Sequence, residues 1–273
     1  MNSIDAQRLS EQLRQRGLGH LLLDVYDRVA STQSTLQQRS ERNDIHGHVV
    51  VAAMQTQGRG RRGKTWVSPA SGNLYASIGW RWPSGQCAIG TLSLTVGCAI
   101  AEALESDFGV SAQLKWPNDL MINSAKLGGI LIDVIPDSRG LLSIIGVGLN
   151  IAMASHMATD VDQAWTDLHS SAPDGACSTM PDTQRVSASV IGAVVDALEQ
   201  FGDTGFEPWR VRWQRRDMLL GRELQIKAED SWVGMGAGIA NDGALLVQTA
   251  QGRIPGYAGD VSVRPLVSGD GTR

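Results

Sequence analysis

The chain has 273 residues and a formal net charge of −4, with a pI of about 5.7. Its 42% of hydrophobic and 19% of charged residues are typical of an ordinary globular protein and exclude a disordered chain. The polar N-terminus predicts no secretory signal peptide, and the longest apolar window, around Leu92 to Leu104, is too short for a membrane span.

Cysteine and histidine usage predicts neither disulfides nor a metal centre. Cys87, Cys98 and Cys177 are odd in number and show no C-x-x-C spacing, so we expect free thiols in a reducing cytoplasm. The close pair His46 and His48 has no evident third ligand, and we therefore predict no metal site there.

Helical and strand-like segments alternate through most of the chain. Helices are predicted over residues 5–16, from the hydroxyl-rich cap at Ala30–Ser34 through Arg39, and over 91–108 and 183–201. Strands are predicted over 21–29, 49–54, 73–80, 112–116, 119–122, 126–135 and 141–150. Residues 156–182 are predicted as loop, with a helical patch near Trp165. The main body is thus α+β, with a mixed, largely antiparallel sheet and flanking helices.

The pattern of predicted elements changes after about Leu219. Short strands are predicted over 222–228, 232–240, 244–250 and 260–264, with turns at 241–243 and 251–252. This pattern predicts a small C-terminal β-barrel of SH3 type. We therefore expect one domain over 1–219 and a second over 220–273.

The densest cluster of charge lies between Gln55 and Trp66, directly after a predicted core strand. It contains three glycines and four cations, which are Arg59, Arg61, Arg62 and Lys64. Glycine allows a close approach of the backbone, and arginine offers planar donor pairs to carboxylate or phosphate oxygens. A flexible basic loop of this kind is suited to close around a small anion.

Two other readings of this loop are weaker. Residues 58–65 satisfy the phosphate-binding pattern G-x-x-x-x-G-K-[ST], but that motif requires a helix opening at Lys64 and Thr65. Pro69 and Gly72 follow where the helix should run. A nucleic-acid patch is disfavoured because the chain is acidic and shows no second basic stripe.

A second cluster comprises Lys115-Trp-Pro-Asn-Asp119 and Lys126-Leu-Gly-Gly129. Pro117 forces the residue before it into an extended conformation, so Asn118 and Asp119 are presented together at a strand end. Each feature alone would suit an ordinary turn or a solvated lysine. Their occurrence beside the glycine–arginine loop is far more specific.

With these motifs the sequence resembles the biotin–protein ligases. The family pattern G-R-G-R-R-G-R-x-W appears at Gly58 to Trp66 with lysine at 64, K-W-P-N-D at Lys115 to Asp119, K-L-x-G-I-L at Lys126 to Leu131, and G-x-G-x-N at Gly146 to Asn150. The family element S-T-N appears as Ser31-Thr32-Gln33, so the role of its third side chain is open. The resemblance runs from about Leu21 into the C-terminal strand at Gly259 to Arg264.

The resemblance implies a class II synthetase-like catalytic domain that joins biotin to ATP, giving biotinyl-5′-AMP and pyrophosphate. The biotinyl group would then pass to one lysine of a biotin carboxyl carrier protein. The biotin carboxylate is already ionised at pH 7, so the first step requires no general base. It requires fixed cations that offset the repulsion between a carboxylate and a triphosphate.

By the same resemblance, Ser31, Thr32 and Gln55 should bind the ureido head of biotin, with Gln33 beside them. Lys126 should reach the carboxylate and the α-phosphate, assisted by Arg61, and Asp119 should either deprotonate the carrier lysine or act as a structural carboxylate. The remaining ligand contacts are expected from Arg59, Gly60, Arg62, Trp66, Asn118, Gly129, Gly148, Asn150, Met153, Trp165 and Arg264. Mg²⁺ is expected to bridge phosphate oxygens without an assigned protein ligand.

The resemblance leaves a rival within the enzyme class and one outside it. A lipoate–protein ligase performs the same adenylation on another acid, and a biotin-sensing repressor would need a DNA-binding module. The roughly twenty residues before the first predicted strand are too few for such a module. We therefore expect no nucleic-acid partner, no membrane association, a monomer or homodimer, and a loop over 58–64 that closes on the ligand.

Overall fold

A computed structural model describes residues 4–70, 72–82, 89–137, 140–153, 161, 163–171, 182–227, 231–259 and 262–266. Of the three cysteines, Cys87 and Cys177 lie outside the described residues. Cys98 is buried and unpaired, and its burial raises the pKa of the thiol to about 12. Cys98 is therefore a free thiol, as predicted, and it lies in the core.

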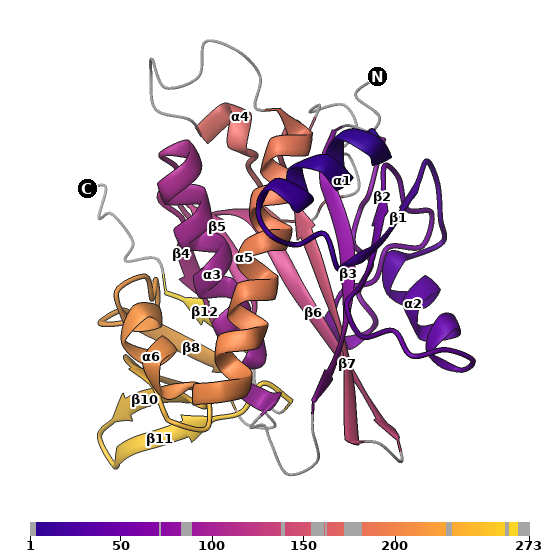
Figure 1. The fold of residues 1–273 in the computed structure, drawn as a ribbon. Coiled ribbons are helices and arrows are strands. Elements are labelled where there is room, and N and C mark those ends of the chain that lie inside the picture. The colour runs from indigo at the N-terminus through magenta and orange to yellow at the C-terminus, as the bar shows by residue number, and fades with distance from the viewer. Residues whose placement is uncertain are drawn as a thin grey trace.

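The main body is built on a seven-stranded sheet with the strand order β1-β2-β3-β7-β6-β5-β4. The strands are β1 (Leu22–Tyr26), β2 (His48–Ala52), β3 (Leu74–Trp82), β4 (Gln113–Lys115), β5 (Asp119–Ile122), β6 (Ala125–Asp137) and β7 (Gly140–Leu149). The pair β1–β2 is parallel and the other pairs are antiparallel. The predicted mixed, largely antiparallel sheet is thus confirmed (Figure 1).

The two faces of this sheet are covered by different helices. The helices α1 (Ala6–Gln15), α3 (Leu92–Phe108) and α5 (Thr183–Thr204) pack on one face, and α2 (Thr32–Ser40) packs on the other. The alternation along β2 shows this division, since Val49 and Val51 belong to the large core while Val50 packs with Leu36 of α2. The face that carries α2 is the one on which the site forms.

Several helix ends follow ordinary capping chemistry, whereas the start of α2 does not follow the predicted one. Asp5 and Asp182 accept hydrogen bonds from the first turns of α1 and α5, and Gly109 ends α3 in the left-handed conformation. Ser31 is the N-cap residue of α2, but its hydroxyl makes no capping hydrogen bond, so the predicted hydroxyl cap is wrong. The Ser31 Oγ is instead buried without a partner among the described residues, and Ser31 borders the cavity described below.

The C-terminal part forms a second sheet with the order β11-β10-β9-β8-β12. Its strands are β8 (Glu223–Lys227), β9 (Trp232–Ile239), β10 (Leu245–Thr249), β11 (Gly252–Gly256) and β12 (Ser262–Pro265). All the pairs are antiparallel, and β11 and β12 stand at the two ends of the order. A C-terminal sheet domain is therefore present. Among the described residues no strand pairing joins β11 to β12, so the SH3-type barrel stays a prediction.

Several elements differ from the sequence prediction. The strand β11 begins at Gly252, where only a turn was expected, and α6 (Glu207–Gln214) was missed. Trp209 and Trp213 of α6 are both buried and lie four residues apart, with Pro208 in the first turn, which is a helical signal. Trp165 lies in an extended bridge to Lys126, and the short helix α4 (Leu168–Ser171) begins only three residues later.

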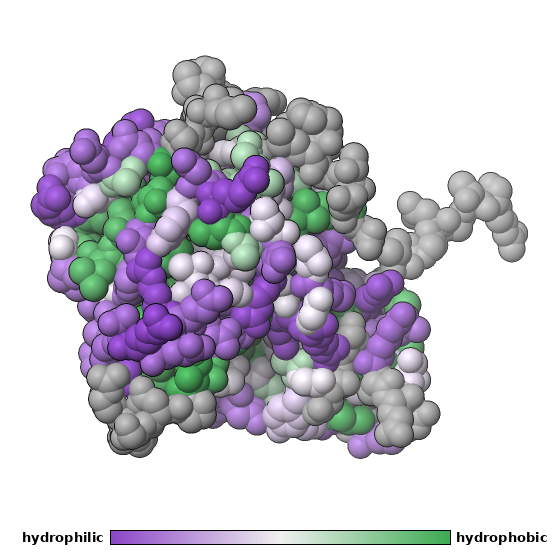
Figure 2. All heavy atoms as spheres, turned by 90° about the vertical axis from the view of Figure 1, so that its right-hand side faces the viewer, coloured by the Kyte–Doolittle hydropathy of each residue, from purple (hydrophilic) through white to green (hydrophobic). Residues whose placement is uncertain are grey.

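The segment Ile89–Phe108 is long and apolar enough to cross a membrane by length and composition, contrary to the sequence estimate. Its residues Leu92, Leu94, Val96 and Ile100 are instead buried in the core of this fold. On the face that Figure 2 shows, apolar side chains are interrupted by hydrophilic ones.

Hydrogen bonds at and just after the edge strand β4 join the main sheet to the C-terminal part and to the segment that leads into it. The backbone of Leu114 in β4 accepts a hydrogen bond from Met218 and donates one to Arg216. The indole Nε1 of Trp116 donates to the carbonyl of Gly243 at 3.0 Å. The K-W-P-N-D segment therefore lies at the junction of the two parts.

Candidate active site

One cross-strand row forms the floor of the site. Register places Tyr75, Gly148, Gly129, Asp119 and Lys115 opposite one another on β3, β7, β6, β5 and β4. Residues directly opposite in antiparallel strands point to the same face of a sheet. Two glycines thus leave an open strip between an aromatic ring on one side and a carboxylate and an ammonium group on the other.

The glycine–arginine loop crosses above this strip as a narrow turn. Trp66 N donates to the carbonyl of Gly58 at 2.9 Å, and Gly60 N donates to the carbonyl of Lys64 at 2.7 Å. The loop contains only a single 3₁₀ turn, Arg61–Gly63, and Lys64 returns to extended backbone. The helix that a P-loop needs at Lys64 is therefore missing, as the sequence predicted.

Trp66 lies directly on the glycine strip. A β-carbon on Gly148 would come within 2.6 Å of the indole, and one on Gly129 within 3.3 Å. The indole Nε1 is buried without a partner among the described residues. The glycines of G-x-G-x-N and K-L-x-G therefore have a steric role, since they make room for the ring.

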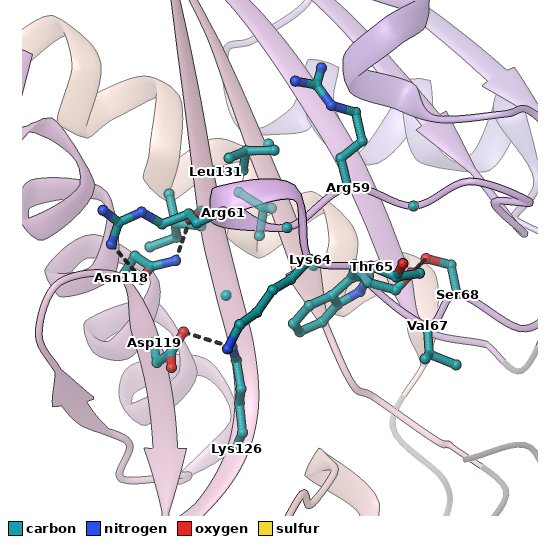
Figure 3. Close-up of a pocket in the computed structure, with 18 of the residues that line it drawn as sticks. Arg59, Arg61, Lys64, Thr65, Val67, Ser68, Asn118, Asp119, Lys126 and Leu131 are labelled. Carbon is teal, nitrogen blue, oxygen red and sulfur yellow. Dashed lines mark hydrogen bonds and ion pairs between the residues drawn. The ribbon is translucent and has the colours of Figure 1, made fainter. Parts of the chain in front are cut away.

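Lys126 reaches the same face through an irregularity in β6. Nζ lies 2.7 Å from Oδ1 of Asp119 and 5.3 Å from the centroid of the Trp66 ring (Figure 3). Residues three apart on a regular strand point to opposite faces. A register shift between β5 and β6 brings the side chain of Lys126 to within 3.4 Å of the β-carbon position on Gly129, so both share one face.

Arg61 and Arg62 tie the loop to both parts of the molecule. Arg61 donates to Oδ1 of Asn118 at 3.2 Å and to the carbonyl of Ala258 at 3.1 Å. Arg62 donates to the carbonyls of Ala258 and Gly259. Burial lowers the pKa of Arg61, the neighbouring Arg62 lowers it further, and Asp119 opposes both effects.

Arg59 points away from this cluster. In Figure 3 its side chain is directed away from Lys126 and Asp119. Its guanidinium group donates to Oδ2 of Asp133 at 3.0 Å and to Oε1 of Gln37 at 3.4 Å. Arg59 still borders the cavity, but its guanidinium group is paired with Asp133 and not with the other charged groups of the site. A carboxylate on the same face of the sheet holds it, and no sequence motif contains that carboxylate.

Lys115 completes the cationic end of the site. Burial lowers the pKa of its ammonium group, and the charges of Lys126, Arg264 and Lys64 lower it further, while Asp119 acts in the opposite sense. These groups therefore lie close enough to repel one another. Such an arrangement is stabilised by an anion placed between the cations.

The opposite end of the site is neutral and rich in hydrogen-bonding groups. Oε1 of Gln55 accepts from Thr32 N at 2.9 Å, and its Nε2 donates to Ser68 Oγ at 2.9 Å. Thr32 Oγ1 lies 2.8 Å from Ser77 Oγ, which donates to Oε1 of Gln33 at 3.0 Å. This end is suited to a neutral polar group.

A third segment closes the side of the site. Lys126 and the segment around Trp165 exchange backbone hydrogen bonds, and Nδ2 of Asn150 donates to the carbonyl of Thr166 at 3.1 Å. Met153 is buried, and its backbone N donates to Oδ2 of Asp167 at 2.9 Å. This segment is therefore fixed to the strand that carries Lys126.

The glycine strip, the cationic end and the neutral end border one cavity of about 1200 Å³. The structure brings together every site residue predicted from the sequence: Ser31, Thr32, Gln33, Gln55, Arg59, Gly60, Arg61, Arg62, Trp66, Asn118, Asp119, Lys126, Gly129, Gly148, Asn150, Met153, Trp165 and Arg264. The lining also includes Lys64, Ser68, Ser77 and Lys115, to which the sequence assigned no role. Lys64 and Lys115 stand within recognised motifs, whereas Ser68 and Ser77 carry no motif signal.

The charge of the lining indicates an anionic ligand. Its basic side chains are Arg59, Arg61, Arg62, Lys64, Lys115, Lys126 and Arg264, and its one acidic side chain among the described residues is Asp119. Three or more His, Cys, Asp or Glu side chains that could hold a metal ion do not come together anywhere in the described residues. The cavity therefore suits a ligand with a neutral polar head and a strongly anionic tail.

Comparison with known proteins agrees with this description. Residues 25–150 match the Biotin/lipoate A/B protein ligase family, and residues 219–264 match the Biotin protein ligase C terminal domain. The bifunctional ligase/repressor BirA of Salmonella typhimurium is 33% identical over 263 residues, which cover 96% of this chain and 78% of the relative. The biotin–[acetyl-CoA-carboxylase] ligase of Mycobacterium tuberculosis is 28% identical, over 94% of this chain and 95% of the relative.

Among solved structures, the biotin protein ligase from Aquifex aeolicus, in complex with biotin and ATP, superposes with a TM-score of 0.76. It is 26% identical to this chain, and the match covers 90% of this chain and 99% of that one.

Proposed function

This chain belongs to the biotin protein ligase family, and from that membership we propose how its cavity activates biotin with ATP and transfers the biotinyl group to a carrier lysine. The observation that carries the assignment is the polarity of the cavity, which is neutral at the Thr32 end and cationic around Lys126. Biotin has a neutral ureido head and a carboxylate tail, so it matches both ends.

In the first step an oxygen of the biotin carboxylate attacks the α-phosphorus of ATP. A carbon–oxygen–phosphorus anhydride forms, the bond to the β-phosphate oxygen breaks, and pyrophosphate leaves. We propose that Lys126 contacts both the carboxylate and the α-phosphate; its position between the glycine strip and the cationic end supports this role. Fixed cations at this point stabilise the charge that develops in the transition state.

Several further contacts follow from the same placement. Arg61, Arg62, Lys64, Lys115 and Arg264 surround the triphosphate, while Trp66, Gly129 and Gly148 form the floor beneath the adenylate. Asn118, Asn150, Met153 and Trp165 bound the nucleoside side, and the backbone of Gly60 lies beside the valerate chain. The Arg59 side chain acts on the loop through Asp133.

In the second step the carrier lysine attacks the carbonyl carbon of the anhydride, an amide forms, and AMP leaves. Asp119 already makes an ion pair with Lys126 and also opposes the lowering of the pKa of Lys115. We propose that Asp119 is chiefly the counter-ion that holds these ammonium groups in place. Its service as a base for the carrier lysine would require the pair with Lys126 to open first.

Mg²⁺ would enter with the nucleotide. The lining supplies one carboxylate among the described residues, and that carboxylate is paired with Lys126. Because the described residues offer no cluster of metal ligands, phosphate oxygens and water would hold the ion. When bound, the ion neutralises phosphate charge.

The proposed partner is a biotin carboxyl carrier domain of a carboxylase, and we propose that the enzyme acts in the cytoplasm as a monomer or homodimer. The C-terminal sheet forms an SH3-like barrel from about residue 220, beside a class II synthetase-like core. The match of residues 219–264 to the ligase C-terminal domain supports this boundary.

Incubation with biotin, ATP, Mg²⁺ and a carrier domain, followed by a streptavidin blot, tests the proposal. A labelled carrier is expected with biotin. Labelling with lipoate but not biotin, detected with an antibody to lipoyl-lysine, would replace it with the lipoate ligase assignment.

A further inference from the structure

The connection between β11 and β12 carries backbone carbonyls that hold the glycine–arginine loop. The strands β11 and β12 stand at opposite ends of the second sheet, so the chain after Gly256 crosses from one end to the other. Arg61 donates to the carbonyl of Ala258 at 3.1 Å, and Arg62 donates to the carbonyls of Ala258 and Gly259. The placement of these arginines therefore depends on what fixes the start of the connection.

The side chain of Tyr257 ties the start of this connection to a neighbouring turn. Its hydroxyl donates to Oδ2 of Asp242 at 3.1 Å, in the turn between β9 and β10. Oδ1 of the same carboxylate accepts from Ala244 N at 3.1 Å, so both oxygens are used and the orientation of the carboxylate is set. The hydrogen bond to Asp242 raises the pKa of the Tyr257 hydroxyl, so Tyr257 remains the donor at neutral pH.

The turn that carries Asp242 is itself fixed to the main body. Gly243 has a φ of 85°, and a β-carbon there would lie 2.9 Å from Cγ2 of Thr91 at the start of α3. Glycine permits both this backbone conformation and this close approach. The carbonyl of Gly243 accepts from Trp116 Nε1 at 3.0 Å. Asp242 therefore stands next to an anchored residue and gives Tyr257 a fixed acceptor.

The K-W-P-N-D segment contacts both ends of this path. Trp116 holds the turn, and Asn118 holds Arg61 at the other end. Nδ2 of Asn118 donates to the carbonyl of Ile130 at 2.8 Å, so its Oδ1 is turned to the guanidinium group of Arg61 (Figure 3). Arg61 therefore has two fixed acceptors, Asn118 and the Ala258 carbonyl, and the second is placed by the C-terminal sheet.

We propose that Asp242 and Tyr257, neither of which lines the cavity, are positioning residues for Arg61. They act through the Ala258 carbonyl, which the hydrogen bond between them holds in reach of the guanidinium group. This inference rests on the proposed function, in which Arg61 faces the triphosphate. A small displacement of a group that contacts the reactants is costly to the reaction, even when its cause lies far from the chemistry.

Two variants break this link at different places, and a third preserves it. Tyr257→Phe removes the donor, and Asp242→Ala removes the acceptor. Asp242→Asn keeps an oxygen for Ala244 N and gains an NH₂ group that donates to the Tyr257 oxygen, so it should behave as the wild type does.

Two control variants lose comparable contacts away from the link. Tyr26→Phe, on β1, removes a hydroxyl that accepts from Arg39. Thr249→Ala, in the same sheet as Asp242, removes an oxygen that accepts from Gln251 N at 3.2 Å in the turn between β10 and β11. Neither residue lines the cavity, so both variants should match the wild type in cleavage and in exchange. Thermal melts show that every variant is folded.

Two measurements report on Arg61. Tryptic cleavage after Arg61 and Arg62 in the free protein needs no substrate, and biotin-dependent ATP–pyrophosphate exchange gives KM for ATP and for biotin. In Tyr257→Phe and Asp242→Ala, both the cleavage rate and KM for ATP should rise by about fivefold, the scale of one hydrogen bond, with KM for biotin within about twofold of the wild type. In an Arg61→Ala background, Tyr257→Phe should raise KM for ATP no further, because the residue through which it acts is gone.

The outcomes separate this inference from the proposed function. Unchanged cleavage in both variants, an unchanged KM for ATP in both, or an equal rise of that KM with and without Arg61 overturns the positioning role. A wild type without biotin-dependent exchange overturns the proposed function, and the cleavage rates then decide the link to Arg61 in the free protein.

Discussion

The indole of Trp66 fills the space that a β-carbon on Gly148 would need, since the two would be only 2.6 Å apart. Gly148→Ala must therefore displace the ring from the floor of the site. We expect KM for ATP to rise by at least about tenfold, with a loss of roughly 1–3 kcal/mol of stability from overpacking. Biotin-dependent ATP–pyrophosphate exchange and thermal melts measure the two effects.

Gly202→Ala is the control for this substitution. Gly202 lies within α5, where a β-carbon would meet only a Trp82 ring carbon at 3.7 Å. Alanine in a helix interior is more favourable than glycine by roughly 0.5–1 kcal/mol, so this variant should be at least as stable as the wild type with unchanged exchange. Equal behaviour of the two variants would contradict the steric role of Gly148.

Lys126→Ala should lower the rate of adenylation by about a hundredfold or more while the fold is retained. Single electrostatic stabilisers of a transition state contribute on this scale. Pyrophosphate exchange isolates the first step from transfer to the carrier. Lys227→Ala, at an exposed lysine on β8, should leave exchange unchanged. Near-normal exchange in Lys126→Ala would remove this lysine from the reaction.

Asp119→Asn separates the two proposed roles of this carboxylate. If Asp119 is the counter-ion of Lys126, its loss should slow both adenylation and transfer, because the ion pair at 2.7 Å orients the ammonium group. Single-turnover transfer from preformed biotinyl-5′-AMP is compared with pyrophosphate exchange. Loss of transfer with normal exchange would favour the role of a base for the carrier lysine.

Protease protection tests the closure of the loop over residues 58–64. Ordering a glycine-rich loop is costly, and ligand anions that pair with its arginines offset that cost. Tryptic cleavage after Arg59, Arg61 or Arg62 should slow when biotin and ATP are added. Equal cleavage with and without both ligands would argue against closure.

The pair between Arg59 and Asp133 should restrain this loop before any ligand binds. Because the pair is partly exposed, it contributes at most about 1 kcal/mol, so Asp133→Asn should speed cleavage of the free protein by no more than about fivefold. Asp44→Asn, which alters an ion pair with Arg81 away from the loop, is the matched control. Identical cleavage of both variants would contradict the restraint.

Asp217 should make stability depend on pH. Burial raises the pKa of its carboxyl from 3.8 to about 6, against the opposing effect of the backbone N–H groups of Leu219 and Leu220. A raised folded pKa means that the folded state holds the proton more tightly, so this group's contribution to stability is full below about pH 4. It falls as the pH rises to about 6 and stays low above that.

The difference between the pKa of Asp217 in the unfolded and in the folded protein corresponds to at most about 3 kcal/mol in the free energy of unfolding. Asp217→Asn keeps an oxygen for Leu219 N and removes the titration, so the variant should be more stable than the wild type at pH 7.5 and similar at pH 4. Urea unfolding at both values measures the difference. A stability difference that is independent of pH would show that Asp217 does not titrate in this window.

Most helices and strands, and the residues that make up the site, could be predicted from the amino-acid sequence. Hydrophobic periodicity predicted the main-body strands, and the site residues predicted from the motifs all border one cavity. These are local properties, because side-chain alternation and turn chemistry depend on residues close in the chain. The missed α6 and β11 are short segments, and β11 begins at a glycine that also reads as a turn.

The contacts between these side chains could not be predicted and are known from the folded structure alone. The alternation of side chains along a strand assigns residues to the two faces of a sheet, but it gives neither the order nor the register of the strands. Strand order and register together place the residues of the row from Tyr75 to Lys115 opposite one another. The register shift that turns Lys126 onto the Asp119 face and the carboxylate that draws Arg59 aside arise from partners distant in the chain. Strand pairing is set by the packing of the whole sheet, so no local pattern could reveal these contacts.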